Sequence, residues 1–181
     1  ILNKVKDTED FENSLLPNLH DLGLPVLGLI PYEEEFSCPT MKFISETLFA
    51  RVLSGEKAMQ NLVHEIFVGA MFSDAIQRMN SLKIKKGKII ITSGDRSDMI
   101  LAALDSQCVG IVLTNNILPP PNIIAKASGM NIPLILAQGD TYQVAKKIDH
   151  GVPLLNNYDD KKLSIWSNLV NTRINPETFL T

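Results

Sequence analysis

The sequence has few of the residue types on which metal and redox sites usually depend. Two cysteines, three histidines and one tryptophan occur among 181 residues. Cys38 and Cys108 lie far apart and form no CxxC motif, and His20, His64 and His150 show no metal-ligand spacing. We therefore expect ordinary thiols, structural or solvated histidines, and no metal site.

Catalytic and targeting signatures are also missing. The chain contains no GxxxxGK[ST] phosphate loop, no GxGxxG and no GxSxG. No apolar run approaches the roughly 18 residues of a membrane-spanning helix, and we find no signal segment. The net charge of −3 gives no general attraction to nucleic acid or anionic lipid. We expect a cytoplasmic chain with no catalytic residue, no cofactor, no nucleic-acid partner and no membrane partner.

The composition is that of an ordinary globular protein, with 45% hydrophobic and 20% charged residues. After residue 87, short apolar runs alternate regularly with amphipathic segments. This alternation predicts an α/β fold with a mostly parallel sheet, βα crossovers and helices on both faces. The predicted strands cover 88–92, 109–113 and 133–137, and the predicted helices cover 96–106, 120–128 and 140–149.

The rest of the chain is less regular, and residues 55–60 are our candidate linker. A helix of about ten residues is expected after Ser37-Cys38-Pro39-Thr40, because proline suits a first helical turn. The other predicted elements are helices at 10–22, 72–79 and 159–171, strands at 24–30 and 64–70, a short strand and turn at 51–56, and a loop at 31–38.

Polar clusters follow three successive predicted strands. Because parallel strands end at one edge of a sheet, we expect these clusters to lie together and to suit a small anionic or nucleotide-like ligand. The candidate ligand-binding residues are Thr92, Ser93, Gly94, Asp95 and Arg96 after the first strand, Thr114, Asn115 and Asn116 after the second, and Asp140 and Thr141 after the third.

The charged members of these clusters also have simpler explanations. Asp95, with Asp98 three residues later, has the pattern of a helix N-cap with a capping-box partner, and Asp140 is a second candidate N-cap. Arg96 fits less easily, because a cation in a first helical turn opposes the helix dipole. Either a carboxylate holds it, or it faces a ligand or a neighbouring subunit.

These motifs, in this order, resemble the DRTGG domain over about residues 64–150. The resemblance rests on Gly69-Ala70-Met71, Ile91-Thr92-Ser93-Gly94-Asp95-Arg96, Leu113-Thr114-Asn115-Asn116 and Asp140-Thr141-Tyr142. Such domains occur in long bacterial phosphate acetyltransferases, between a dethiobiotin-synthetase-like segment and the catalytic domain, and beside CBS domains in some pyrophosphatases. Thr114-Asn115-Asn116 replaces the Thr-Gly-Gly of the family name. Asparagine tolerates left-handed backbone, but its side chain would crowd an approaching ligand.

The preceding region resembles the last part of a dethiobiotin-synthetase-like P-loop domain, through Asn3-Lys4-Val5, the run 26–31 and Cys38-Pro39-Thr40. This resemblance implies that Asn3 lies near a nucleotide base, although the phosphate-loop half of such a domain is missing. We expect a fragment of a larger parent. Its predicted parts are a P-loop remnant at 1–57, a DRTGG-like domain at 58–150 and a helical extension at 151–181.

The sequence thus predicts a non-catalytic regulatory or oligomerisation module of a phosphate-acetyltransferase-like protein. It would self-associate through its sheet and sense a small anionic metabolite or nucleotide at the strand ends. Two alternatives stay open. One is a fragment of a phosphate acetyltransferase or P-loop ligase-like enzyme that is active only with its missing parts, and the other is a scaffold without a ligand.

Overall fold

The structure is a computed structural model that describes residues 1–69, 87–155, 157 and 159–174. The chain forms two compact units, which we call the small unit (residues 1–37 and 154–181) and the sheet unit (residues 38–153). The sequence placed its boundaries after residues 57 and 150. The first boundary of the compact units lies earlier because the segment that begins at Cys38 packs with the sheet.

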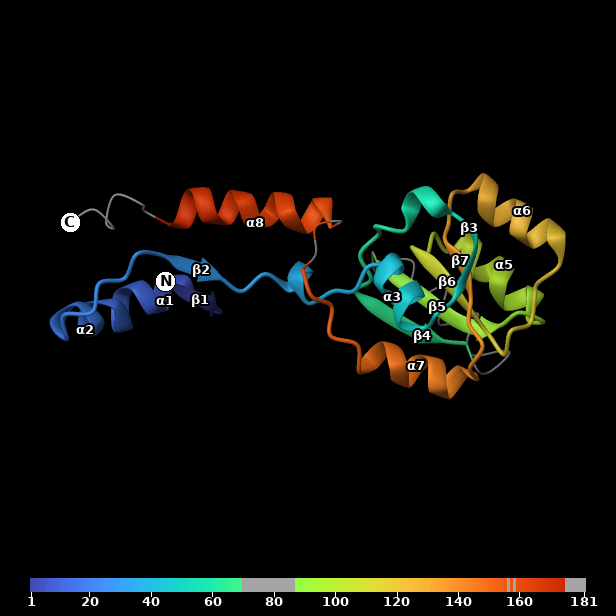
Figure 1. The fold of residues 1–181 in the computed structure, drawn as a ribbon, viewed down its shortest axis with the longest axis horizontal. Coiled ribbons are helices and arrows are strands. Elements are labelled where there is room, and N and C mark those ends of the chain that lie inside the picture. The colour runs from blue at the N-terminus through green and yellow to red at the C-terminus, as the bar shows by residue number, and fades with distance from the viewer. Residues whose placement is uncertain (70–86, 156, 158, 175–181) are drawn as a thin grey trace. The chain divides into compact units, whose positions relative to one another are not determined.

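The sheet unit contains a five-stranded sheet in the order β3-β7-β6-β5-β4 (Figure 1). Strands β4 to β7 are parallel, and β3 pairs antiparallel with β7 at one edge. The predicted α/β fold with a mostly parallel sheet is therefore confirmed. The strands are β3 (Arg51–Ser54), β4 (Glu65–Val68), β5 (Lys88–Ser93), β6 (Gly110–Thr114) and β7 (Leu134–Leu136).

Side chains of the central strands alternate between two fully covered faces. Ile90 and Ile111 point into one hydrophobic cluster, and Ile89, Ile91 and Val112 point into the other. All five are fully buried. Strands that are apolar at every position are expected where helices cover both faces of a sheet.

The helices that cover the two faces explain the layout at the strand ends. Helices α5 (Ser97–Asp105) and α6 (Pro121–Gly129) contribute to the first cluster, whereas α3 (Met41–Thr47) and α7 (Thr141–Asp149) contribute to the second (Figure 1). The chain therefore leaves β6 toward one face and the adjacent β7 toward the other. In open α/β sheets, such a divergence between neighbouring strands is where ligands bind.

Three predicted features of the first part of the chain are wrong. The strand expected at 24–30 forms only as β2 (Leu29–Pro31). The helix after Pro39 begins two residues later than the proline, since Thr40 is the N-cap and accepts a hydrogen bond from the Phe43 N–H at 3.1 Å. The expected linker contains Gly55, whose left-handed backbone (φ 73°) lies against Ile132 within the sheet unit. The helix predicted at 72–79 lies outside the described residues.

The small unit holds a two-stranded parallel sheet of β1 (Leu2–Val5) and β2. Phe36 and Trp166 pack edge to face, with ring centroids 6.2 Å apart, and the buried Lys162 donates from Nζ to the Phe36 carbonyl at 3.4 Å. These contacts fasten the last helix to the loop after β2. The remaining elements are α1 (Thr8–Asp10), the π-helix η1 (Phe11–Leu15), α2 (Leu16–Asp21), η2 (Glu34–Phe36) and α8 (Asp160–Arg173), with η3 (Glu56–Ala58) in the sheet unit.

Among the described residues, no helix combines the length and apolar character that crossing a membrane requires.

The two faces of the sheet predict how isoleucine truncations differ. Ile90→Ala removes a fully buried side chain from the first cluster, so it should lower the free energy of unfolding by about 3 kcal/mol. Ile66→Ala, on the neighbouring strand β4, removes a side chain that is 36% exposed and should cost about 1 kcal/mol or less. Urea denaturation followed by circular dichroism measures both values. Equal losses would contradict the described burial.

Candidate functional site

The three predicted polar clusters lie together at the carboxyl ends of β5, β6 and β7. We call this end of the sheet the edge of the candidate site. In the parallel register Ser93 is level with Thr114. The Thr114 hydroxyl lies between the other two clusters: it donates to the Thr92 carbonyl at 3.4 Å, and its oxygen is 3.1 Å from the Thr141 hydroxyl. Thr114 is fully buried and joins all three strand ends.

The two asparagines after β6 form a left-handed turn. Their φ angles are 60° for Asn115 and 54° for Asn116, a region that glycine and asparagine enter more readily than other residues. Their backbone N–H groups donate to the carbonyls of Gly139 and Ala137, both at 2.9 Å. The turn is thereby tied to the loop after β7. Both asparagines are exposed.

Glycine is required after β5 because of a close backbone approach. A Cβ on Gly94 would overlap the carbonyl oxygen of Ile117, which belongs to the loop after β6. The neighbouring Asp95 is exposed and Ser93 is half-buried. This contact fixes the loop after β5 against the loop after β6, so the edge is held by backbone packing as well as by Thr114.

The predicted capping role of Asp95 is wrong. Arg96 occupies the N-cap position of α5, with no side-chain cap bond, and helix begins at Ser97. The shift arises because the Arg96 N–H donates to the Ser93 carbonyl at 3.1 Å, which adds a turn before the helix. The sequence predicts Arg96 inside the first helical turn. In the structure it lies one residue before that turn.

Asp98 holds the Arg96 guanidinium. The Arg96 Nε lies 3.4 Å from Asp98 Oδ1, and the two side chains are 20% and 34% exposed. Asp98 lies in the first turn of α5, where a carboxylate is favoured by the helix dipole. Of the alternatives for Arg96, a carboxylate partner is thus present.

The remaining predicted site residues differ in their contacts. Asp140 caps α7, as predicted, by accepting a hydrogen bond from the Gln143 N–H at 2.8 Å. The Thr92 hydroxyl is buried and has no hydrogen-bond partner within the described ranges. Asn3 belongs to the small unit, where its exposed side chain accepts a hydrogen bond from the Lys4 N–H at 2.8 Å.

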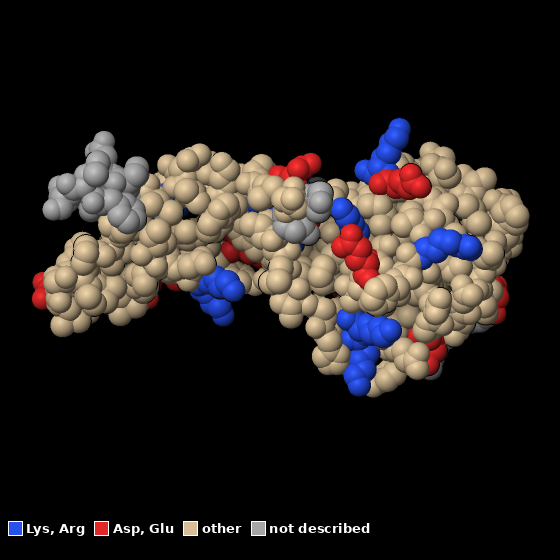
Figure 2. Space-filling model, in the orientation of Figure 1, with Lys and Arg blue, Asp and Glu red and all other residues tan. Residues whose placement is uncertain are grey.

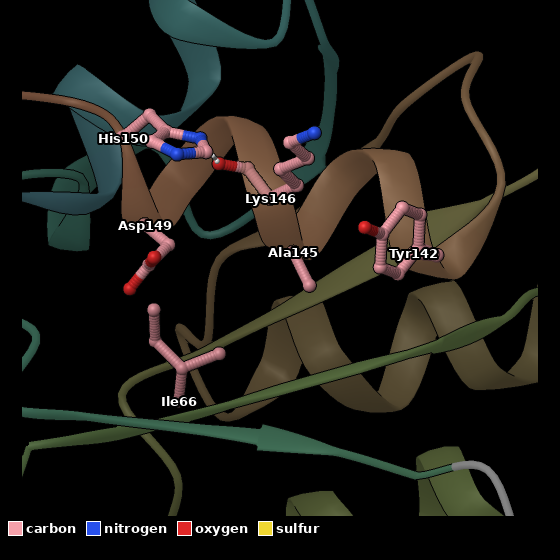
Figure 3. Close-up of a pocket in the computed structure, with 6 residues that line it drawn as sticks. All are labelled: Ile66, Tyr142, Ala145, Lys146, Asp149 and His150. Carbon is pink, nitrogen blue, oxygen red and sulfur yellow. Dashed lines mark hydrogen bonds between the residues drawn. The ribbon is translucent and has the colours of Figure 1, made fainter.

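A hollow of about 450 Å³, which the sequence did not reveal, lies between α7 and β4, the last strand of the sheet among the described residues (Figure 3). In Figure 3, Ala145 and Asp149 project from α7 toward Ile66. The sequence shows which residues of α7 share one helix face, because they are three or four positions apart. It does not show that β4 lies opposite this face. The lining residues are Ile66, Tyr142, Ala145, Lys146, Asp149 and His150.

Charge at the surface is mixed. Figure 2 shows lysine and arginine side chains interspersed with aspartate and glutamate over the face in view, without a continuous basic area. Within the described ranges, no group of three or more histidine, cysteine, aspartate or glutamate side chains is placed to hold a metal ion.

The DRTGG domain model matches residues 44–151, which is more than half of the chain. The chain belongs to the DRTGG domain family. The match begins before residue 58, where the sequence had placed the start of the domain, and so includes β3 and part of α3. It ends at residue 151, close to the boundary of the sheet unit.

Phosphate acetyltransferases are among the similar curated proteins. The chain is 30% identical to the enzyme of Synechocystis over 148 residues (76% of this chain, 21% of the enzyme). It is 29% identical to that of Nitratidesulfovibrio vulgaris over 147 residues (75% of this chain, 20% of the enzyme). The chain therefore spans about a fifth of the length of these relatives.

A solved structure shares the fold. It is the crystal structure of the CBS and DRTGG domains of the regulatory region of Clostridium perfringens pyrophosphatase, complexed with the activator diadenosine tetraphosphate. The TM-score is 0.55 at 18% identity, and the alignment covers 91% of this chain and 84% of that one.

Alanine substitution of two glycines in the loops at these strand ends tests the contact between the loops after β5 and β6. Gly94→Ala places a methyl group on the Ile117 carbonyl, where only backbone movement can relieve the overlap. It should lower the free energy of unfolding by about 2–3 kcal/mol. Gly139→Ala meets the end of the Gln143 side chain at 3.2 Å, which can rotate away, so its cost should stay below about 1 kcal/mol. Thermal and urea denaturation compare the two, and a tolerated Gly94→Ala would refute the close approach.

Proposed function

We propose that this chain is a non-catalytic regulatory module that binds a small anionic metabolite or nucleotide at the ends of β5, β6 and β7. The observation that supports the proposal most directly is the set of contacts that joins the ends of these three strands. Thr114 and the paired asparagine turn hold three strand ends together, at the place where the chain leaves adjacent strands toward opposite faces. Membership of the DRTGG family supports the regulatory role.

The side chains at this edge favour a nucleotide over a simple anion. Asn115 and Asn116 present exposed carboxamides, and Arg96 supplies a guanidinium that can bind phosphate with two parallel hydrogen bonds. Asp95 and Asp140 are exposed carboxylates that would repel a bare anion. They would accept hydrogen bonds from the hydroxyl and amino groups of a nucleotide, so a ligand with both kinds of group fits the set best.

We also propose that the module self-associates through its sheet. Strand β4 is the last strand at its end of the described sheet, and two of its apolar side chains, Ile66 and Val68, are 36% and 41% exposed. A strand at the end of a sheet that exposes apolar residues is prone to pair with another chain. A dimer that covers this strand would remove those side chains from water.

An enzyme fragment is the second candidate. The relatives above are phosphate acetyltransferases of which this chain corresponds to about a fifth. In this proposal the first segment derives from a dethiobiotin-synthetase-like P-loop domain, with Asn3 near the nucleotide base, in a cytoplasmic parent. Sequencing the parent reading frame separates the two candidates, since a downstream acetyltransferase domain or an upstream phosphate loop would favour the enzyme.

Ligand binding at the edge can be measured directly. Isothermal titration of the 181-residue chain with ATP, ADP, NADH, acetyl-CoA and pyruvate should show binding of at least one nucleotide-containing compound. Arg96→Ala should weaken that binding at least tenfold, since it removes the only cation that we assign to the site. Lys126→Ala is the matched control, because Lys126 on α6 forms an exposed ion pair at 2.8 Å with Asp105, at the opposite end of α5 from Arg96. Absence of binding heat for every compound would count against the sensing proposal.

Self-association should depend on strand β4. Sedimentation velocity at about 50 μM should show a dimer or larger species. Val68→Lys should shift it to monomer, because a charge on the exposed face of an edge strand opposes pairing. Val152→Lys is the control, since Val152 is 73% exposed and lies outside the sheet. A monomeric parent chain, or dissociation by both variants alike, would contradict the assigned surface.

A further inference from the structure

Cys38 and His64 form a hydrogen-bonded pair on the sheet unit, away from the strand ends described above. The Cys38 Sγ lies 3.2 Å from His64 Nδ1, although the two residues are 26 positions apart in the chain. Cys38 is 7% exposed, and His64 is exposed. A thiol is thus held against an imidazole that has access to water.

Backbone pairing fixes this contact. Thr40 and Leu62 form an antiparallel bridge, and the Val63 N–H donates to the Pro39 carbonyl at 2.8 Å. Continuing the same register by one residue brings Cys38 opposite His64, where side chains of facing residues meet. The pair is therefore a product of the fold, with no dependence on a flexible loop.

Glycine also shapes the histidine side of the pair. The backbone of Gly87, in a left-handed conformation (φ 80°), lies against the His64 ring, and a Cβ there would overlap the ring carbon Cδ2. The Gly87 carbonyl accepts the His64 N–H at 2.7 Å. Ring and backbone of His64 are both held in place.

The other cysteine of the chain has a different environment. Cys108 is 4% exposed in the first hydrophobic cluster. Burial raises the pKa of the Cys108 thiol to about 12, against smaller lowering effects of the Gly110 backbone and the Lys88 charge. A thiol with that pKa carries almost no thiolate at neutral pH and is unreactive. Cys108 is therefore an internal reference for Cys38.

We infer that Cys38 is a reactive thiol, activated by His64, that forms mixed disulfides with low-molecular-weight disulfides. A thiolate is the attacking species in such exchange, and an adjacent imidazole that takes the thiol proton raises its amount at neutral pH. Nothing in the proposed ligand site is needed for this chemistry.

The exchange step is balanced by the groups named. The Cys38 proton passes to His64 Nδ1, and the Cys38 thiolate attacks one sulfur of a disulfide R–S–S–R. The Cys38–S–S–R bond forms as the R–S–S–R bond breaks, and the leaving R–S⁻ takes the proton that His64 holds. The small disulfide is the oxidant, and Cys38 is oxidised to the mixed disulfide.

Two charged residues that adjoin the pair in the chain belong to the other face of the sheet. Glu65 and Lys88 follow His64 and Gly87, and they face each other in the β4–β5 register. Side chains alternate along a strand, so these two lie on the side of Phe67 and Ile90, in the first cluster near Cys108. The titratable group in direct contact with the Cys38 sulfur at 3.2 Å is His64.

The pH dependence of alkylation tests the inference. The native chain is treated with iodoacetamide at about pH 6 and pH 8.5, and labelling of each cysteine is followed by peptide mass spectrometry. If His64 does not act as a base, the alkylation rate of Cys38 should fall roughly 150-fold from pH 8.5 to pH 6. The thiolate fraction of a thiol of pKa about 8.5 falls by the same factor. With His64 as base, the fall should be less than about 10-fold. Because the ratio compares one thiol with itself, the effect of burial on access cancels.

Three variants and a second probe separate activation from structure. His64→Gln should restore the roughly 150-fold fall in the alkylation rate of Cys38. His20→Gln changes a histidine on a helix of the small unit and should leave the fall below about 10-fold. Incubation with oxidised glutathione should add one glutathione to the native chain and none to Cys38→Ser. The inference is overturned if Cys38 stays unlabelled, if its rate falls as steeply as an unassisted thiol, or if His64→Gln leaves the ratio unchanged in a chain with native circular dichroism.

Discussion

The parallel pairing of β5, β6 and β7 is the constraint on which the candidate site depends. These strands are apolar at almost every position, and each is covered on both faces by helices. A slip of one residue in their register would exchange the side chains of the two clusters. The pairing therefore has one favourable register, and that register brings Ser93 level with Thr114 and the three polar loops to a common edge.

The same constraint explains why much of this half of the fold could be predicted from the sequence. Short apolar runs separated by amphipathic segments identify buried strands and their crossovers, and the parallel direction of the strands then places the polar loops at one end of the sheet. The predicted strand at 88–92 and the observed Lys88–Ser93 differ by one residue. Prediction was poorer in the small unit: of the expected strand 24–30, only Leu29 and Ile30 belong to β2 and pair with β1, because a two-stranded sheet offers few partners.

Local sequence patterns gave wrong predictions where contacts with residues distant in the chain determine the backbone conformation. Asp95 with Asp98 has the spacing of a capping box, yet the N-cap is Arg96. The loop after β5 is fixed by the approach of Gly94 to Ile117, a residue from the next crossover, and no local pattern contains that contact. The hollow beside α7 was missed for the same reason, since β4 is remote in the chain from α7. The pairing of Cys38 with His64, 26 residues apart, is a third case.

The pair of Arg96 and Asp98 explains how a positively charged side chain is accommodated at these strand ends, and it bears on the proposed ligand site. In the structure Asp98 neutralises part of the guanidinium charge at 3.4 Å. A phosphate that bound Arg96 would displace Asp98 and so exchange one carboxylate for another anion. The displaced carboxylate keeps its place in the first turn of α5, where the helix dipole stabilises it by about 0.3–1 kcal/mol. In the proposed site this exchange would leave no charge without compensation, and the net affinity would come from the hydrogen bonds that the asparagine turn and the remaining carboxylates add.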